Sequence, residues 1–343
     1  MPKVSFLMSN YNTPPEYLKK SLDSVLSQVF KGFEVVIIND GSVDDSKIVL
    51  YEYAKKDNRI KIIENEQNLG LPSSLNRGID HCRGEYIARM DTDDICYPDR
   101  LEKQVAYMDA HPKCIVSGAW ADVFCEDENN IVKTWTPKIC SQDEYRIRLM
   151  FSSASLIIHP TAIFRRELLI KNNLRYPEEL KYKYAEDYKM WTQCSSCAEV
   201  GILEDTVIKY RDENSDNRIT VSHEKEMAQC GFEIQRNQLK QLDIELTQEM
   251  HKYNHQLLLG RKPYDIKYKR WMDLIIKQNA KYNVYSQPVL KQLLYERWYN
   301  IVYYGIAYEK SFSKRIKYFN SLYFGQRTKF ILSRITKKKP VKF

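Results

Sequence analysis

The chain has 343 residues, 43% of them hydrophobic and 29% charged, and it carries a formal net charge of +8. This length and composition are typical of folded globular proteins of one or two domains, and they exclude a disordered or fibrous chain. No stretch of the sequence approaches the roughly 18 consecutive apolar residues of a membrane-spanning helix, which excludes an integral membrane protein of that kind.

Short β-rich runs alternate with longer amphipathic runs in the first third of the chain, a pattern typical of βαβ units in a largely parallel sheet. Strands are expected at 4–8, 34–38, 60–63, 86–90 and 114–120. Apolar residues recur at spacings of three and four from Tyr17 to Leu26, which predicts a helix there. Further helices are expected after Asp45 and from Pro98 to Met108.

Polar residues gather in the loops that follow the first four expected strands. These loops are 9–12 (SNYN), 39–42 (NDGS), 68–70 (NLG) and 91–94 (DTDD). Parallel sheets place ligand sites at the carboxyl ends of their strands, so we expect the four loops to converge on one edge of the sheet.

The pattern changes twice in the rest of the chain. From about Asp143 to Arg211 it is mixed, with a strand expected at 156–164, a helix from about Glu186 and a short strand that ends at Arg211. The remainder looks helical, and one long helix is expected with Pro288 in its first turn. We therefore expect an α/β domain over residues 1–221 and a helical region over residues 222–343.

Asp91, Asp93 and Asp94 place three carboxylates within four residues, directly after an apolar strand. Crowded like charges are costly unless a cation neutralises them, and carboxylate oxygens suit Mn²⁺ or Mg²⁺. Such an ion would bridge to diphosphate oxygens and stabilise a leaving nucleotide. A solvated acidic turn that caps the next helix is the alternative.

Asp40 and Tyr11 are candidates for contacts with a nucleotide. Asp40 ends an apolar strand, where a carboxylate can accept hydrogen bonds from a base or a ribose, and Gly41 lets a ligand approach the backbone. Tyr11 follows the first strand and offers a ring face for stacking. The alternatives are a helix N-terminal turn at Asp40 and a purely structural tyrosine.

The mixed segment holds candidates for the acceptor side of a site. Glu186 and Asp187 begin a helix that contains Trp191. A carboxylate there could take a proton from an acceptor hydroxyl, although acids are also favoured at helix N-termini by the helix dipole. His159 is a candidate contact for acceptor or phosphate, with a satisfied structural histidine as the alternative. Arg211 could pair with a phosphate or form a surface salt bridge.

Together these segments resemble the family-2 glycosyltransferases, which have the GT-A fold and transfer a sugar from a nucleotide donor with inversion at the anomeric carbon. The resemblance covers about residues 1–211. It rests on eight blocks in family order: VSFLMSNYN at 4–12, LDSVLSQ at 22–28, INDGS at 38–42, NLGL at 68–71, LNRGI at 75–79, GEYIAR at 84–89, DTDD at 91–94 and PDRL at 98–101.

The resemblance implies a mostly parallel α/β sheet flanked by helices, with a helical C-terminal extension. It also implies roles for particular residues. Those on the nucleotide-sugar side are Ser9, Tyr11, Asp40, Asn68, Asn76, Asp91 and Asp93, with uracil as the usual base and Asp91 beside the ribose or sugar. Asp93, helped by Asp94, would hold Mn²⁺ or Mg²⁺.

Asp187 would be the single general base of an inverting displacement, and His159, Glu186, Trp191 and Arg211 would be possible acceptor or phosphate contacts. The sequence departs from the family pattern in one place. Many relatives carry a histidine shortly after the Tyr-Arg pair, whereas Asp212 follows here. Arg218 and His223 are the candidates to replace it.

The positive charge is concentrated at the C-terminus. Residues 311–343 contain ten Lys or Arg and no Asp or Glu, so the other 310 residues carry a net charge of 8 − 10 = −2. Because apolar residues are interleaved with the basic ones, we expect this tail to dock on an anionic membrane surface. A solvated basic helix and a nucleic-acid contact are the alternatives, but no nucleic-acid recognition fold is visible, so we expect no nucleic-acid partner.

The eight cysteines are scattered, and the chain enters its first strand-like run without a signal peptide. We expect a reducing cytoplasmic location, peripheral to the inner face of the cell membrane. A metal or redox role for Cys194 and Cys197 is disfavoured because no second pair accompanies them.

The sequence therefore predicts a metal-dependent hexosyltransferase that acts on a glycan or lipid-linked glycan in bacterial surface-polysaccharide synthesis. A sugar-nucleotide-forming nucleotidyltransferase is the first rival. Enzymes that resemble that class carry a glycine-rich, Arg-containing loop after the first strand, whereas this chain has NYNTPP there. A non-catalytic glycan- or membrane-binding scaffold is the second. It is disfavoured by the intact Asp40, Asp91, Asp93 and Asp187.

Overall fold

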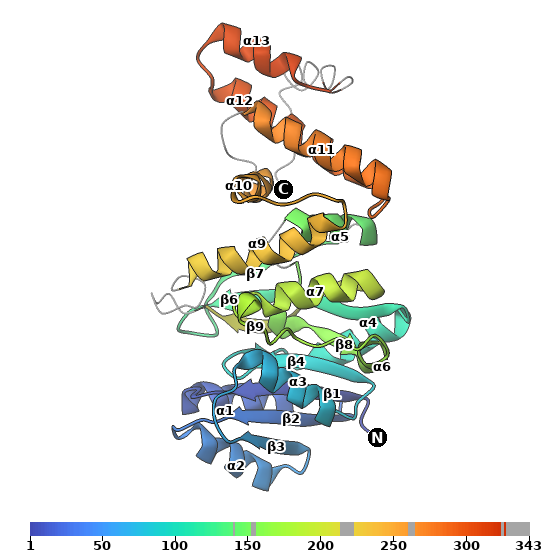
Figure 1. Ribbon diagram of the computed structural model, residues 1–343. Helices are drawn as coiled ribbons and strands as arrows, with labels where there is room; N and C mark the ends of the chain where they lie inside the picture. Colours follow the sequence, from blue (N-terminus) through green and yellow to red (C-terminus); the bar gives the residue numbers. More distant parts are fainter. Residues whose placement is uncertain (140, 152–155, 213–222, 260–264, 324–325, 327–343) are drawn as a thin grey trace. The chain divides into compact units, whose positions relative to one another are not determined.

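The computed structural model describes residues 1–139, 141–151, 156–212, 223–259, 265–323 and 326 (Figure 1). The chain divides into two compact units. Unit 1 consists of Met1–Gln142 with Ala154–Cys230, and unit 2 consists of Asp143–Ser153 with Gly231–Phe343. Unit 1 contains the sheet, and unit 2 is built from helices.

Unit 1 is built around a sheet that has nine strands in the described residues. These are β1 (Val4–Asn10), β2 (Phe33–Asp40), β3 (Ile60–Asn65), β4 (Tyr86–Asp91), β5 (Ile95–Cys96), β6 (Cys114–Phe124), β7 (Ile131–Trp135), β8 (Ile163–Arg165) and β9 (Glu199–Arg211). They lie in the order β3-β2-β1-β4-β8-β6-β9-β5, and β7 pairs with β6.

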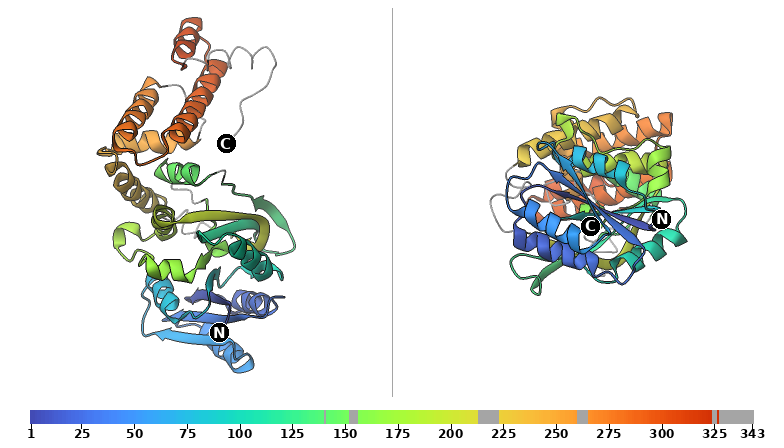
Figure 2. Two further views of the ribbon diagram at one scale, coloured as in Figure 1. Left: turned by 90° about the vertical axis from the view of Figure 1, so that its right-hand side faces the viewer. Right: turned by 90° about the horizontal axis from the view of Figure 1, so that it is seen from below.

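The four strands from β3 to β4 are parallel, as the alternating pattern predicted. Each of the five strands expected in this region is present, and each ends later than expected. Parallel pairing brings the carboxyl ends of β1 to β4 to one edge, where their following loops meet. The twist of these strands is visible in Figure 2.

The other half of the sheet is mixed, because β8 is antiparallel to both β4 and β6 while β9 runs parallel to β6. The prediction of a strand over residues 156–164, all of which the structure describes, is wrong. A 3₁₀ turn, η1 (His159–Thr161), occupies its middle, and only β8 follows. Pro160 has no backbone N–H and therefore cannot donate to a neighbouring strand. The strand ending at Arg211 is present but is longer than expected.

Helices cover both faces of the sheet. They are α1 (Pro15–Leu26), α2 (Ser46–Lys56), α3 (Leu71–His81), α4 (Arg100–Ala110), α6 (Arg166–Lys171) and α7 (Glu186–Cys197), with a second 3₁₀ turn, η2 (Leu180–Tyr182). Apolar side chains of α1, α2 and α4 join Phe6 and Val35 on one face. On the opposite face Trp191 of α7 stacks on Phe164 of β8, with ring centroids 5.8 Å apart.

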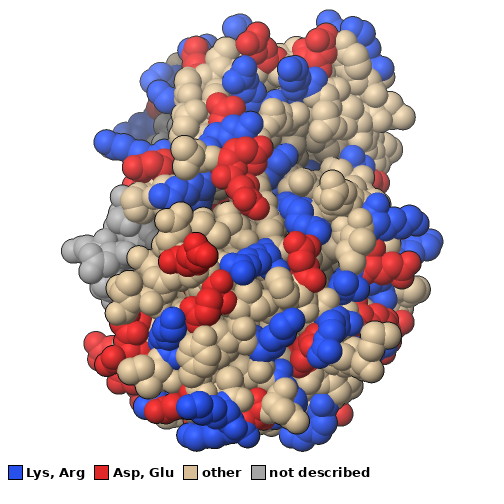
Figure 3. Space-filling model, turned by 60° about the horizontal axis from the view of Figure 1, so that its bottom comes forward, with Lys and Arg blue, Asp and Glu red and all other residues tan. Residues whose placement is uncertain are grey.

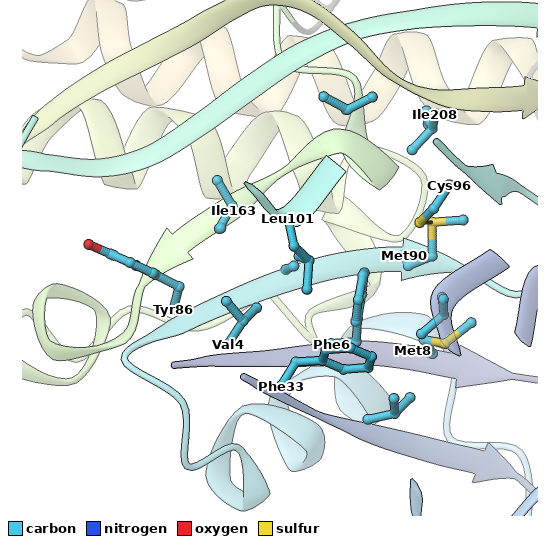
Figure 4. Packing of buried hydrophobic residues seen from close by; sticks show 14 of the residues in the cluster. Val4, Phe6, Met8, Phe33, Tyr86, Met90, Cys96, Leu101, Ile163 and Ile208 are labelled. Carbon is cyan, nitrogen blue, oxygen red and sulfur yellow. Dashed lines mark hydrogen bonds between the residues drawn. The ribbon is translucent and has the colours of Figure 1, made fainter. Parts of the chain in front are cut away.

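The core between α4 and the sheet is continuous. Leu101 of α4 lies above Val4 and Phe6 of β1, as Figure 4 shows. A fully buried side chain such as Phe6 contributes roughly 1.5–3 kcal/mol relative to an exposed one. This core fixes the strand from which the acidic residues at 91–94 emerge.

Close packing of α3 against the sheet depends on Gly78. A Cβ atom added at Gly78 would collide with Leu7 Cδ1 and would lie 3.3 Å from Ile38 Cγ1. The absence of a side chain therefore lets α3 lie directly on β1 and β2. It also places the loop before α3 next to the carboxyl end of β2.

Unit 2 contains α5 (Gln142–Phe151), α10 (Gln248–Leu259), α11 (Ile266–Tyr282), α12 (Gln287–Tyr308) and α13 (Phe312–Asn320), and α9 (Glu224–Lys240) continues into it from unit 1. Pro288 lies in the first turn of α12, as predicted. Trp271, Trp298 and Tyr299 are buried in a core of this unit's own. Among the described residues, no helix is long and apolar enough to cross a membrane.

Candidate functional site

Three hydrogen-bonded contacts join the four loops at the carboxyl edge of the parallel strands. Asn12 N donates to Ser42 Oγ at 3.1 Å, and Gly70 N donates to Asp40 Oδ2 at 2.9 Å. The hydroxyls of Thr13 and Thr92 lie 2.7 Å apart in the interior. The predicted convergence of the loops on one edge is therefore confirmed.

The acidic turn, residues 91–94, crowds its carboxylates as the sequence suggested. Oxygen atoms of Asp91, Asp93 and Asp94 lie within 4.8 Å of one another. Burial and the charge of Asp91 raise the pKa of Asp93 to about 6. Burial and the charges of Asp93 and Asp91 raise the pKa of Asp94 well above its usual range. Like charges at this separation make the turn a strong candidate for a bound cation.

The environment of the Asp94 carboxylate shows whether the oxygens of this turn fit a divalent cation. Its side chain is only 1% exposed, and Oδ1 accepts the backbone N–H of Arg211 at 2.8 Å. Oδ2 is buried and has no hydrogen-bond partner within the described part of the chain. A hard cation would supply the missing partner, so the oxygens present fit Mn²⁺ or Mg²⁺. The turn does not cap the following helix, because the N-cap residue of α4 is Asp99.

Arg211 supports the acidic turn from the end of β9. Its Nε atom donates to the backbone oxygen of Asp93 at 3.1 Å. Its guanidinium lies between the rings of Tyr17 and Phe124, 3.8 Å and 4.6 Å from their centroids. Because this side chain is buried, the alternative of a surface salt bridge is wrong. Its Nη2 atom has no partner in the described residues.

Asp40 joins the end of β2 to the loop before α3. Oδ1 accepts hydrogen bonds from Asn65 Nδ2 at 2.7 Å and Leu69 N at 2.9 Å, and Oδ2 accepts from Gly70 N. Each carboxylate oxygen has further lone pairs, so a ligand N–H can still be bound. Asn65 was missed by the sequence analysis, although it ends the third strand as Asp40 ends the second.

Tyr11 projects from a loop that is held at both sides. Its side chain is 51% exposed. Asn12, next to it, has φ 51° and accepts the backbone N–H of Val43 on Oδ1 at 2.9 Å. Asn10 donates from Nδ2 to Ser42 Oγ at 3.0 Å. The ring of Tyr11 is therefore presented to solvent by a loop with fixed backbone.

The other nucleotide-side candidates lie in different settings. Ser9 of β1 is paired in register with Asp91 of β4, so both lie on one face at the edge of the sheet. Asn68 is exposed in its loop. The amide of Asn76 instead binds the backbone of Tyr176, accepting from N at 2.8 Å and donating to O at 2.9 Å. The structure thus uses Asn76 to hold the segment that precedes α7.

Glu186 and Asp187 occupy the first turn of α7. Oδ1 of Asp187 accepts the backbone N–H of Tyr188 at 2.5 Å, as expected of an acid at a helix N-terminus. Burial and the charge of Asp187 raise the pKa of Glu186 to about 8. Burial also raises the pKa of Asp187. A carboxylate with a raised pKa is a better proton acceptor for a hydroxyl.

His159 and Trp191 lie together beneath this helix. Nε2 of His159 is 2.9 Å from the hydroxyl of Tyr176, and its ring meets Trp191 edge-on at 5.9 Å. Burial and the positive charge of Arg89 lower the pKa of His159 well below its usual range, so the imidazole is neutral at neutral pH. His159 thus has a hydrogen-bond partner within the protein, which agrees with the alternative of a satisfied structural histidine.

Arg89 was not a candidate in the sequence analysis. Its Nη1 atom donates to Oδ2 of Asp91, and its side chain is buried. The signal was available, because a charged residue stands inside the otherwise apolar run from Tyr86 to Met90. Buried charges in proteins are paired or functional.

Two glycosyltransferases are similar to this chain over more than half of its length. A glycosyltransferase of Methanocaldococcus jannaschii is 35% identical over 221 residues, which is 64% of this chain and 74% of that protein. The amylovoran biosynthesis glycosyltransferase AmsE of Erwinia amylovora is 35% identical over 210 residues, 60% of this chain and 75% of that protein.

A solved structure has the same architecture. Residues 1–349 of S. aureus TarS, in complex with UDP-GlcNAc, align with a TM-score of 0.56 at 19% identity. The alignment covers 98% of this chain and 92% of that one. This likeness agrees with the expected GT-A fold. Residues 5–172 match the profile of Glycosyl transferase family 2, and together with its relatives this match shows that the chain is a glycosyltransferase of that family.

Proposed function

We propose that this glycosyltransferase moves a sugar from a UDP-sugar, with inversion, to a hydroxyl of a glycan or lipid-linked glycan during surface-polysaccharide synthesis. One observation carries the proposal. The acidic turn and the Glu186–Asp187 pair come from distant parts of the chain, yet Arg89, which binds Asp91, lies on the same face of β4 as Ile87, and Phe164, the partner of Ile87, stacks on Trp191 of α7. This arrangement supports placing the two carboxylate groups in one site.

The relatives support the choice of donor and pathway. The TarS complex contains UDP-GlcNAc, and AmsE is named for amylovoran biosynthesis. Tyr11 would stack on the uracil, while Ser9, Asp40 and Asn68 would hold the rest of the nucleoside. Half-exposed Tyr11 and the free lone pairs of Asp40 suit these roles.

Asp93 and Asp94 would hold the Mn²⁺ or Mg²⁺ ion, with Asp91 turned toward the ribose or sugar. When bound, the ion offsets the negative charge of the diphosphate. Asp94 offers a buried oxygen without a partner, and Arg211 fixes the turn from behind.

Asp187 would act as the general base. An acceptor hydroxyl oxygen attacks the anomeric carbon, its proton passes to Asp187, and the bond from that carbon to the diphosphate oxygen breaks. UDP leaves with the electron pair of that bond. Since attack and departure take place on opposite faces of the sugar, one base is sufficient and no covalent enzyme intermediate is needed.

The test is incubation with a panel of radiolabelled sugar nucleotides, with and without Mn²⁺, and with glycan and lipid-linked acceptors. We expect release of UDP from a UDP-sugar by the wild type. Asp187→Ala should bind UDP normally in calorimetry and lose transfer. Absence of hydrolysis and transfer with every UDP-sugar, together with absence of UDP binding, would overturn the proposal.

The proposal extends to docking on an anionic membrane at the cytoplasmic face. Helix α13 has no buried residue, and Phe312 and Ile316 on it are 77% and 46% exposed. Lys314, Arg315 and Lys317 lie on the same helix. On the face in Figure 3, by contrast, Lys and Arg are interspersed with Asp and Glu. Residues 324–325 and 327–343 of the expected basic tail lie outside the described residues.

A further inference from the structure

Arg89 is a buried cation at the centre of the site. It is 2% exposed, and its side chain lies on the same face of β4 as Asp91, two residues further along the strand. The backbone of Arg89 is fully bonded, since its N–H donates to Ala162 O at 2.8 Å and its oxygen accepts from Arg100 Nη2 at 2.7 Å. The strand therefore fixes the origin of this side chain.

The guanidinium of Arg89 has donors to spare. Nη1 binds Oδ2 of Asp91, but Nε is buried and has no hydrogen-bond partner among the residues that the structure describes. Arginine carries five N–H donors in a planar fork, so one group can serve acceptors on two sides at once. A buried donor without a partner is unfavourable and is uncommon in native proteins unless it has a function.

Arg89 lies on the sheet face that carries both carboxylate groups. It shares this face of β4 with Asp91 and with Ile87, whose partner Phe164 stacks on Trp191, one helical turn after Asp187 in α7. The charge of Arg89 opposes the effect of burial on the pKa values of Asp93 and Asp94 in the turn, and on those of Glu186 and Asp187 in α7. Without a cation these two groups would repel each other, because the charge of Asp91 also acts on Glu186.

Two further titratable groups lie around the base. Burial raises the pKa of Tyr176 well above its usual range. The charges of Asp187 and Glu186 also raise this pKa, and the charge of Arg89 opposes them. His159 is held neutral by burial and by Arg89. Both are therefore uncharged at neutral pH. Arg89, on β4, therefore supplies positive charge that acts on Glu186 and Asp187 in the described part of the site.

We propose that Arg89 is a positioning residue for sugar transfer, which holds the Asp91 carboxylate on the donor side and lies on the sheet face that packs against α7, the helix of the Glu186–Asp187 pair, on the acceptor side. This inference rests on the proposed function of the site. A single rigid guanidinium would keep donor and base at one separation, and its positive charge would favour the ionised form of Asp187, which accepts the proton. An ion pair that only stabilised the fold would leave kcat unchanged in a folded variant that keeps the charge.

The experiment compares Arg89→Gln and Arg89→Lys with Arg100→Lys. Arg100 is a matched control, because it is fully buried and donates to Gln104, Met90, Cys96 and the Arg89 backbone, none of which is a carboxylate. The titration of Asp187 is followed by carboxyl ¹³C NMR, assigned with Asp187→Asn. The acid limb of the kcat/KM profile is measured in parallel.

Loss of a neighbouring positive charge raises a carboxyl pKa. We therefore expect Arg89→Gln to move the titration of Asp187 and the acid limb upward by about one pH unit, with a fall in kcat larger than any change in KM. Arg89→Lys keeps the charge but lacks the fork. It should leave the titration near that of the wild type while kcat falls. Arg100→Lys should not move the titration.

An unchanged Asp187 titration in folded Arg89→Gln would overturn the inference, as would an equal shift in Arg100→Lys. If Arg89→Gln does not fold, Arg89→Lys decides, because full kcat in that variant also overturns it. The NMR titration needs no turnover. A wild type that lacks transferase activity but shows an Arg89-dependent titration would contradict the proposed function and leave the coupling established.

Discussion

The backbone N–H of Arg211 donates to Oδ1 of Asp94 at 2.8 Å, although the two residues are 117 positions apart. The contact follows from strand pairing, because β5, directly after the acidic turn, is antiparallel to β9 with Ile95 opposite Lys209. The end of one strand thus sets the conformation of a turn that the first half of the chain supplies.

Asp94→Asn tests the cation site with little change in shape. The amide oxygen can still accept from Arg211, while the buried charge is removed, so stability without metal should be equal or higher. We expect the rise in Tm on addition of Mn²⁺ to be lost. Asp99→Asn, a partly exposed acid paired with Lys103, should keep that rise. An equal Mn²⁺ response in Asp94→Asn would contradict the assignment.

Asp40→Asn tests the contact between β2 and the loop before α3. An amide NH₂ would face either Gly70 N–H or the donors of Leu69 and Asn65, so at least one donor loses its acceptor. We expect a loss of about 1–3 kcal/mol in the free energy of unfolding, and weaker UDP binding. Denaturant unfolding and calorimetry measure both. Asp45→Asn, whose exposed side chain makes no capping hydrogen bond, is the control.

Asn12 tests whether the backbone beside Tyr11 sets nucleotide affinity. At φ 51° an alanine costs roughly 1 kcal/mol more than a glycine. Asn12→Ala should therefore be less stable than Asn12→Gly, and UDP binding should weaken most in Asn12→Ala. Asn173 has φ 50° at the end of α6, so Asn173→Ala should lose similar stability. Equal UDP affinity in Asn12→Ala and Asn173→Ala would show that the backbone conformation of this loop does not set nucleotide affinity.

The raised pKa of Glu186 predicts that the stability of the fold depends on pH. Burial raises its pKa to about 8 from the usual 4.5, so between these values the folded protein keeps a proton that the unfolded chain has released. The contribution of Glu186 to stability therefore rises as the pH falls from about 8 to about 4.5. Denaturant unfolding across this range should show a flatter profile for Glu186→Gln. Exposed Glu179→Gln should keep the wild-type slope, and an unchanged slope in Glu186→Gln would be evidence against the shift.

Membrane docking predicts a loss of vesicle binding when α13 is changed. Charge reversal of Lys314 and Lys317 should reduce the free energy of binding to phosphatidylserine vesicles, measured by co-sedimentation, by about 1 kcal/mol or more for each residue. Phe312→Ser with Ile316→Ser should weaken it in a salt-independent way. Lys291→Glu on α12 is the control with an exposed basic residue elsewhere in unit 2. Unchanged partitioning of the α13 variants would refute docking.

Local patterns were sufficient for the parallel half of the sheet. Apolar runs such as Val35–Ile38 and the amphipathic spacing of α1 depend on neighbours in the sequence, so strands and helices there were predicted at nearly the right places. The expected strand at 156–164 was wrong because one residue, Pro160, removes a donor from the run. The antiparallel pairs of β8 have no local signal.

The site divides in the same way. By itself the sequence determined that Asp91, Asp93 and Asp94 crowd one turn, because their spacing along the chain suffices for that conclusion. Only the tertiary structure decided that Arg211 locks this turn and that Asn76 serves the Tyr176 segment.

It also decided that Arg89, which binds Asp91, lies on the sheet face that packs against α7. These relationships join residues about 100 positions apart, and the pairing of strands that creates them cannot be read from any single segment. Burial then sets their charge states, because desolvation acts only once the whole fold has excluded water.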